Sequence, residues 1–120
     1  LSLMLIITAI YYKDLQKENN NWNKAGNISQ NMLINFRDNY SKLKSDSNIY
    51  IINPPMKLNN AWVFPVGVFD SLWFVYRESS PAVYQVQSLE EAKAKIQNNQ
   101  TKNNHIFIFD NKGNIREIKP

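Results

Sequence analysis

Few residues of this chain could carry out chemistry, and the first to consider are cysteine, histidine and glycine. The 120 residues include no cysteine, one histidine and three glycines. Without cysteine there is no disulfide, thiolate ligand or cysteine nucleophile, and His105 alone cannot build a zinc site of the usual kind. Three glycines are too few for a phosphate-binding loop of the Walker or dinucleotide type. We therefore predict no catalytic, cofactor-binding or metal-binding residue, and a structural role for His105.

The acidic residues give no catalytic pattern either. Asp70 and Glu78 flank an aromatic segment, with Arg77 beside them, but acid and base catalysis needs two groups close to the reacting atoms, and nothing in this spacing brings the two carboxylates together. Residues 110–114 have some likeness to a calcium loop, yet Lys112 stands where an oxygen ligand is needed. We expect an ordinary turn there.

The segment 61–76 is richer in aromatic residues than the core of a small domain requires. It holds six aromatic residues: Trp62, Phe64, Phe69, Trp73, Phe74 and Tyr76. Aromatic rings bind sugars or lie at membrane surfaces, although a core role for most of the six is the favoured alternative. Because so small a domain cannot bury every ring, we predict a candidate interface of Trp62, Phe64, Phe69 and Trp73. Trp62 and Phe64 are expected to be partly exposed, facing the membrane surface or a membrane region of the parent protein.

The chain begins with an apolar run. Leu1 to Tyr12 carries no charge, and charged residues follow at once from Lys13. A membrane-spanning helix needs about 20 apolar residues, so this run, with two tyrosines at its polar end, predicts the last half of a transmembrane helix. The alternative is a buried N-terminal element of an ordinary domain. On the first interpretation, Leu1 to Tyr12 is helical, contacts membrane lipid and packs little against the rest, and the chain is the C-terminal part of a longer protein.

Composition limits the remainder to one domain. About a hundred residues follow the apolar run, which is enough for one domain and too few for two. The net charge of +4 comes from 14 basic and 10 acidic residues, and the lysines are scattered without the basic block that nucleic-acid binding requires. We therefore divide the chain into residues 1–18, the end of a transmembrane helix with its exit from the membrane, and residues 19–120, a single small α/β domain without a nucleic-acid partner.

Periodicity predicts the elements of that domain. Asn19 to Asn21 is expected to interrupt the first helix, and apolar residues at steps of three and four then predict an amphipathic helix from Trp22 to about Lys44. In segment 66–76 strand and helix compete, and we favour a helix with one apolar face formed by Val68, Leu72, Val75 and Tyr76. Ser88 and Glu91 have the spacing of a capping box, which predicts a helix to about Gln97. The predicted strands are residues 49–52, 82–86 and 105–109, with a turn at 110–113 and a returning strand at 114–118.

Strands that alternate with helices predict an α/β fold with a small, mostly parallel sheet, flanking helices and a C-terminal β-hairpin, preceded by the end of a transmembrane helix. The expected sheet core consists of Ile51, Val83, Ile106 and Ile108, contacted from the long helix by Ile28, Leu33 and Phe36.

Several of these segments together resemble a known family. The apolar run ending in Tyr11 and Tyr12, segments 21–26 and 49–55, and segment 61–67 running into 72–76 are similar to the C-terminal tail of bacterial polytopic membrane proteins related to GT-C type, mannosyltransferase-like glycosyltransferases. These enzymes use polyprenyl-phosphate sugars, and their catalytic acid lies near the start of the membrane region. The resemblance therefore implies no catalytic residue here, but a small extracytoplasmic domain after the last membrane helix.

These observations predict an accessory, extracytoplasmic C-terminal domain of a multispanning, glycosyltransferase-like membrane protein. Its expected partners are membrane lipid, through Leu1 to Tyr12, and the membrane region of the parent protein; no cofactor is expected. The alternative is a membrane-anchored or soluble small binding module that uses the aromatic segment 61–76.

Overall fold

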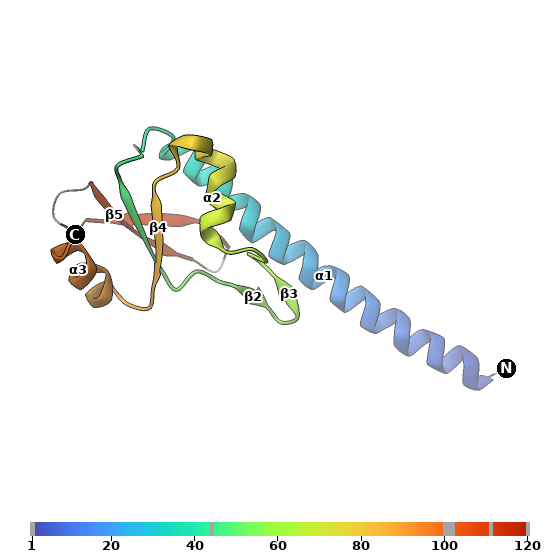
Figure 1. Cartoon of the computed structure of the whole chain (residues 1–120). Helices are drawn as coiled ribbons and strands as arrows, with labels where there is room; N and C mark the ends of the chain where they lie inside the picture. Colours follow the sequence, from blue (N-terminus) through green and yellow to red (C-terminus); the bar gives the residue numbers. More distant parts are fainter. Residues whose placement is uncertain (1, 44, 100–102, 111, 120) are drawn as a thin grey trace.

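The computed structural model describes residues 2–43, 45–99, 103–110 and 112–119. A long helix, α1 (Ser2–Asn39), leads into an α/β body, and its first half extends away from that body into solvent (Figure 1). The molecule is correspondingly elongated, measuring 71 Å along its longest axis. Within the described residues, no helix combines the length and the apolar composition needed to cross a bilayer.

The body is built on a four-stranded sheet. Its strands are β1 (Asn48–Ile52), β4 (Ala82–Val86), β5 (Asn104–Phe109) and β6 (Ile115–Ile118), arranged in the order β4-β1-β5-β6. The first three are parallel and β6 is antiparallel to β5, which confirms the predicted α/β class with its mostly parallel sheet and C-terminal hairpin. Every residue of β1 is buried, because a central parallel strand is covered by helices on both faces.

Helices cover both faces of the sheet. On one face lie α1, α2 (Val68–Tyr76) and a small hairpin of β2 (Lys57–Leu58) and β3 (Ala61–Trp62), and on the other lies α3 (Leu89–Gln97). Because successive strand residues point to opposite faces, Ile51 and Phe107 pack with α1 and α2, whereas Tyr50 and Ile106 pack with α3.

This alternation corrects part of the predicted core. Ile51, Phe36 and Ile106 are fully buried, as expected. However, Ile106 belongs to the α3 side, so the expected contact between Ile106 and the long helix is wrong, and Phe107 takes that place. Val83 and Ile108 are only half-buried, because β4 and the C-terminal part of β5 are less completely covered than β1.

Helix α1 passes through Asn19 to Asn21 without a break, so the predicted interruption is wrong. Asparagine is intrinsically less favourable in a helix than alanine by only a few tenths of a kcal/mol. The hairpin offsets this cost: the Asn59 Nδ2 donates to Asn21 Oδ1 over 3.1 Å, and the Asn60 Nδ2 donates to Glu18 Oε1 over 3.0 Å. The helix also ends at Asn39, before the predicted end near Lys44.

The β2–β3 hairpin was not among the predicted elements. Its turn consists of Asn59 and Asn60, and Asn59 has a φ of 53°. Asparagine tolerates such a left-handed backbone and is common in two-residue hairpin turns. An Asn-Asn pair between two short extended segments was therefore the signal that could have found this hairpin.

The predicted start of α3 and the predicted β5–β6 turn are both present, although the capping box is only half formed. Ser88 caps α3 by accepting a hydrogen bond from the Glu91 amide over 3.1 Å, although the Glu91 carboxylate reaches back to the Gln87 amide rather than to that of Ser88. In the β5–β6 turn, Asp110 accepts hydrogen bonds from the side chain and backbone of Asn114 and from the Lys112 amide, which hold the pKa of the Asp110 carboxyl below its usual range.

Candidate interaction surface

The first eleven residues of α1 form an exposed apolar helix, here called the stalk (Ser2–Tyr12). All of its large apolar side chains are exposed, from 45% at Ile7 to 75% at Met4. They lie on every side of the helix rather than in one stripe, whereas a helix that packs on a single protein surface needs only a stripe. As predicted, the described part of the apolar run is helical and packs little against the body.

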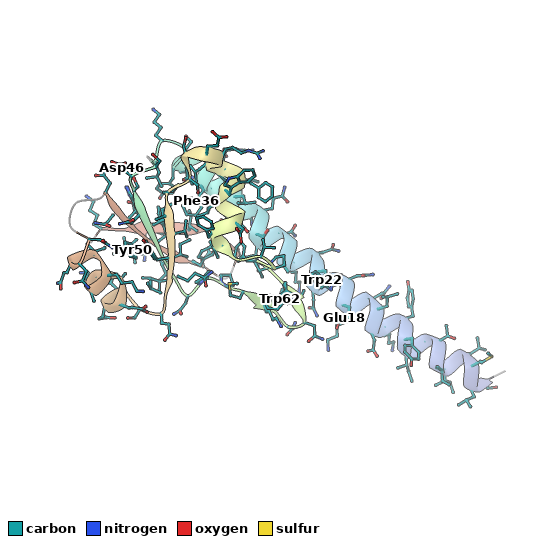
Figure 2. The ribbon with its side chains drawn as sticks, viewed as in Figure 1. Glu18, Trp22, Phe36, Asp46, Tyr50 and Trp62 are labelled. Carbon is teal, nitrogen blue, oxygen red and sulfur yellow. The ribbon has the colours of Figure 1, made fainter. Side chains whose placement is uncertain are left out.

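The rest of α1, residues 13–39, joins the stalk to the body. Ala25, Met32 and Phe36 are fully buried in the core shared with α2 and the sheet. The Phe36 ring meets that of Phe107 edge to face, with 4.9 Å between ring centroids, and Figure 2 shows Phe36 directed into the body. The stalk is therefore a straight extension of a core helix.

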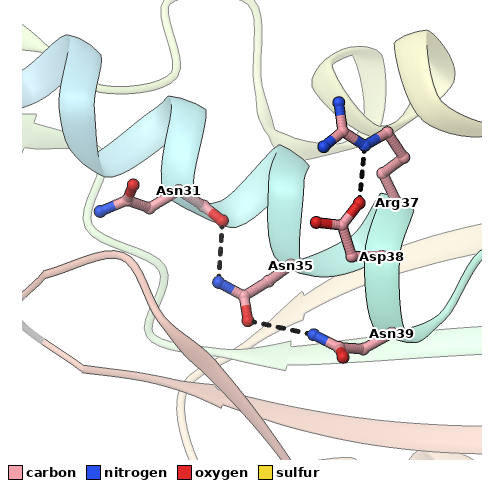
Figure 3. Close-up of polar contacts among 5 residues, drawn as sticks. All are labelled: Asn31, Asn35, Arg37, Asp38 and Asn39. Atoms are coloured by element: carbon pink, nitrogen blue, oxygen red, sulfur yellow. Dashed lines mark hydrogen bonds and ion pairs between the residues drawn. The ribbon is translucent and has the colours of Figure 1, made fainter.

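Near its C-terminal end, α1 carries polar side chains that form local hydrogen bonds. The Asn35 Nδ2 donates to the Asn31 carbonyl over 2.9 Å, and the Arg37 Nε donates to Asp38 Oδ1 over 2.7 Å (Figure 3). Arg37 lowers the pKa of the Asp38 carboxyl through this hydrogen bond. The Asn31 Nδ2 donates in turn to the Lys112 carbonyl over 3.0 Å. Because these groups have partners within the chain, we assign no binding role to them.

In the aromatic segment 61–76, the buried and the exposed rings are not those that the sequence predicted. Phe64 is 1% exposed and packs in the core near Phe109, so the expectation that it is partly exposed is wrong. Trp62 is 42% exposed, as expected. The favoured core role for most of the six rings is also wrong, because among them only Phe64 and Tyr76 are buried; the exposed rings are Trp62, Phe69, Trp73 and Phe74.

Trp62 lies apart from the others, on the hairpin that packs against α1. The Lys57 Nζ sits 3.9 Å from the centroid of its indole ring. Figure 2 shows Trp62 on the side of the molecule where Glu18 and Trp22 of α1 lie, and the hydrogen bonds from Asn59 and Asn60 hold the hairpin there.

The remaining exposed rings share one surface of α2, which we call the α2 face (Phe69, Asp70, Trp73, Phe74 and Arg77). All five side chains are exposed. Asp70, Trp73, Phe74 and Arg77 follow one another at helical steps of three, one and three, which places them on the same side of a helix. The opposite side of α2 is buried through Val68, Leu72 and Tyr76, as the predicted apolar stripe required.

Arg77 completes this face just after the last residue of α2. Its guanidinium carbon lies 5.0 Å from the Trp73 ring centroid and 6.0 Å from that of Phe74. Its backbone has a φ of 53°, a conformation that is unfavourable for a residue other than glycine. The two tilted rings and the cation form one continuous amphipathic patch, and the structure brings the predicted residues Phe69 and Trp73 into it.

Among the described residues, no three His, Asp or Glu side chains converge as metal ligands. His105 Nδ1 lies 2.7 Å from Glu117 Oε1 on the neighbouring strand, and its ring stacks on Phe107, which agrees with the predicted structural role.

Compared with protein-family models, curated proteins and solved structures, the chain matches none. The functional argument therefore depends on the stalk and the α2 face.

Proposed function

We propose that this chain is a membrane-anchored interaction domain without catalytic activity of its own, in which lipid surrounds the stalk and the α/β body presents the α2 face. The observation that supports this most directly is the stalk, which is exposed and apolar on every side yet continuous with a helix that forms the core.

Lipid suits the stalk better than a protein surface does. A helix that is apolar all round is stable where its whole circumference is shielded from water. At a rise of 1.5 Å per residue, Ser2–Tyr12 is about 16 Å long, roughly half the hydrocarbon thickness of a bilayer. Tyr11 and Tyr12 stand at the polar end, where aromatic residues anchor helices at the membrane interface.

The α2 face is too distant from such a membrane to be a second lipid contact. The Tyr76 hydroxyl at the end of α2 donates to the Tyr40 carbonyl over 2.8 Å, and Tyr40 follows Tyr12 by 28 residues, or about 42 Å of helix. With α1 upright in the membrane, the α2 face is thus available to a partner in water. The more specific accessory role in a glycosyltransferase-like protein, and the extracytoplasmic side, stay predictions.

Vesicle flotation tests the proposal. The full chain is expected to float with neutral phosphatidylcholine vesicles, and Ile6→Glu/Ile7→Glu to abolish flotation because charged side chains are costly in the hydrocarbon region. The matched control, Asn19→Glu/Asn20→Glu, adds the same charge to exposed positions of the same helix outside the stalk and is expected to float like the unmodified chain.

Two outcomes would contradict the anchor. One is an unmodified chain that stays with the soluble fraction, and the other is equal flotation of both substituted chains. Neutral vesicles exclude attraction of the basic protein to anionic headgroups as the cause of binding.

A further inference from the structure

We infer that the α2 face is a two-fold symmetric dimer interface whose partner is a second copy of this chain. This inference deepens the proposed function by naming the partner of its interaction surface, and it rests on that proposal only for the role of the membrane in bringing two copies together.

The order of charges on α2 is the main argument. Asp70 and Arg77 stand at the two ends of the face, and Trp73 and Phe74 lie between them. The midpoint between positions 70 and 77 falls between Trp73 and Phe74. If two α2 helices pack antiparallel about an axis at that midpoint, Asp70 of each copy faces Arg77 of the other while the four central rings meet around the axis. In such an isologous interface, each contact occurs twice.

The distances agree with this arrangement. Asp70 and Arg77 are seven residues apart, or about 10.5 Å along the helix axis, and the same spacing on the second copy brings both ion pairs into register at once. The Arg77 guanidinium carbon lies over the Trp73 and Phe74 rings. A guanidinium that lies over aromatic rings can still pair with a carboxylate through the N–H groups in its plane.

The mixed charge also distinguishes a second copy from other occupants. A partner of one charge sign, such as an acidic peptide or a basic surface, would meet a like charge at Asp70 or at Arg77, which costs binding energy. A second copy carries the same two charges in reverse order when it packs antiparallel. An aromatic centre with a charged rim is also the usual composition of a specific interface.

The area of the face predicts a weak dimer. Phe69, Trp73 and Phe74 are 49%, 43% and 61% exposed, which corresponds to about 100 Å² for each ring. Two copies together bury about 600 Å² of ring surface, less than a stable interface between free proteins requires. Anchoring both copies to one membrane raises their effective concentration, so dimers are expected to form on vesicles well before they form in solution.

Disulfide trapping tests the inference, and the absence of native cysteine makes it specific. Phe74→Cys places one thiol beside the proposed axis, where the same thiol of a second copy comes close. Ala94→Cys is the control, because it is exposed on α3 on the opposite face of the sheet. On neutral vesicles, Phe74→Cys is expected to give at least fivefold more cross-linked dimer than Ala94→Cys.

Charge reversal then tests the orientation. In the Phe74→Cys background, Asp70→Arg alone or Arg77→Asp alone places like charges opposite each other and should lower cross-linking at least fivefold. The double variant Asp70→Arg/Arg77→Asp restores opposite charges. It should return cross-linking to within twofold of the level given by Phe74→Cys alone. Asp70→Asn, which removes a charge without adding repulsion and perturbs the helix less, should lower cross-linking by a smaller factor than Asp70→Arg.

The inference is overturned if Phe74→Cys cross-links no more than Ala94→Cys, or if the double reversal fails to recover while circular dichroism shows an intact fold. Flotation of the same samples distinguishes failure of the proposed dimer from failure of the proposed membrane anchor. Chains that float without cross-linking contradict only the dimer. Chains that cross-link at high concentration, respond to charge reversal and do not float contradict only the membrane.

Discussion

The stalk and the rest of α1 form one uninterrupted helix but have opposite relations to the rest of the molecule. The stalk is the more apolar part, yet it buries none of its large side chains. The remainder, residues 13–39, contains asparagines, lysines and an arginine, yet it supplies Ala25, Ile28, Met32 and Phe36 to the core. The difference lies in spacing: steps of three and four align apolar residues along one side, whereas a continuous apolar run gives no preferred side to bury.

This comparison shows that helix continuity does not imply shared stability. The segment 13–39 is held by core packing and by the hairpin contacts at Glu18 and Asn21. Among the described residues, the side-chain hydrogen bonds of the stalk join it only to other residues of α1, and its apolar surface is shielded from water only where another apolar phase surrounds it. Substitutions in the two parts should therefore differ in size.

The largest difference is expected between Phe36→Ala and Leu5→Ala. Phe36 is fully buried against Phe107, and its truncation should lower the free energy of unfolding by about 3–5 kcal/mol. Leu5 is exposed on the stalk, so its truncation should change that free energy by less than about 0.5 kcal/mol. Urea denaturation followed by tryptophan fluorescence measures both, and similar losses at the two positions would mean that the stalk belongs to the folded core.

The next comparison is between two glycines outside the stalk, Gly113 and Gly26. Gly113 has a φ of 84°, and a Cβ there would overlap the backbone of Ile28, so Gly113→Ala should cost about 1–3 kcal/mol or more. Gly26 lies within α1 with open space around it, so Gly26→Ala should stabilise by about 0.5–1 kcal/mol. Thermal melts of the two variants should shift in opposite directions, and a stabilising Gly113→Ala would contradict the close packing of the β5–β6 turn on α1.

A smaller effect depends on pH. Burial raises the pKa of Tyr76, so folding favours the neutral phenol: the full contribution is present below the unfolded pKa of about 10 and declines as pH rises above it. Tyr76→Phe also removes the hydrogen bond to Tyr40 at the end of α1, which should cost about 1 kcal/mol at pH 8. Between pH 10 and 11, its stability should fall less steeply than that of the unmodified chain.

Tyr11→Phe is the matched control, because Tyr11 is exposed on the stalk. Urea denaturation at pH 8, 10 and 11 should give it the same pH dependence as the unmodified chain. If Tyr76→Phe retained the full alkaline loss of stability, the buried Tyr76 hydroxyl would not be its source.

The smallest change is expected from removing residues 1–12. Because the described stalk residues pack little against the body, the free energy of unfolding should change by less than about 0.5 kcal/mol, and solubility should improve. Loss of a cooperative unfolding transition in the shortened chain would show instead that the stalk is required for the fold.

The sequence alone was sufficient for the features that depend on neighbouring residues. The four strands of the main sheet, the Ser88 cap, the turn at Gly113 and the apolar stripe of α2 each follow from residue types only a few positions apart. The same stripe also implied that Phe69, Trp73 and Phe74 point outward. The prediction that Phe64 is partly exposed did not take this into account.

Other features were decided by contacts between distant segments. A hairpin some forty residues later hydrogen-bonds to Glu18 and Asn21 and so supports the helix across the asparagines. Phe64 is buried where β5 supplies Phe109 beside it. Phe107 rather than Ile106 faces α1 because the pairing of β5 with β1 fixes which side each residue takes. Local sequence sets the period of a helix or strand, but only the partners packed on it determine which of its faces is buried.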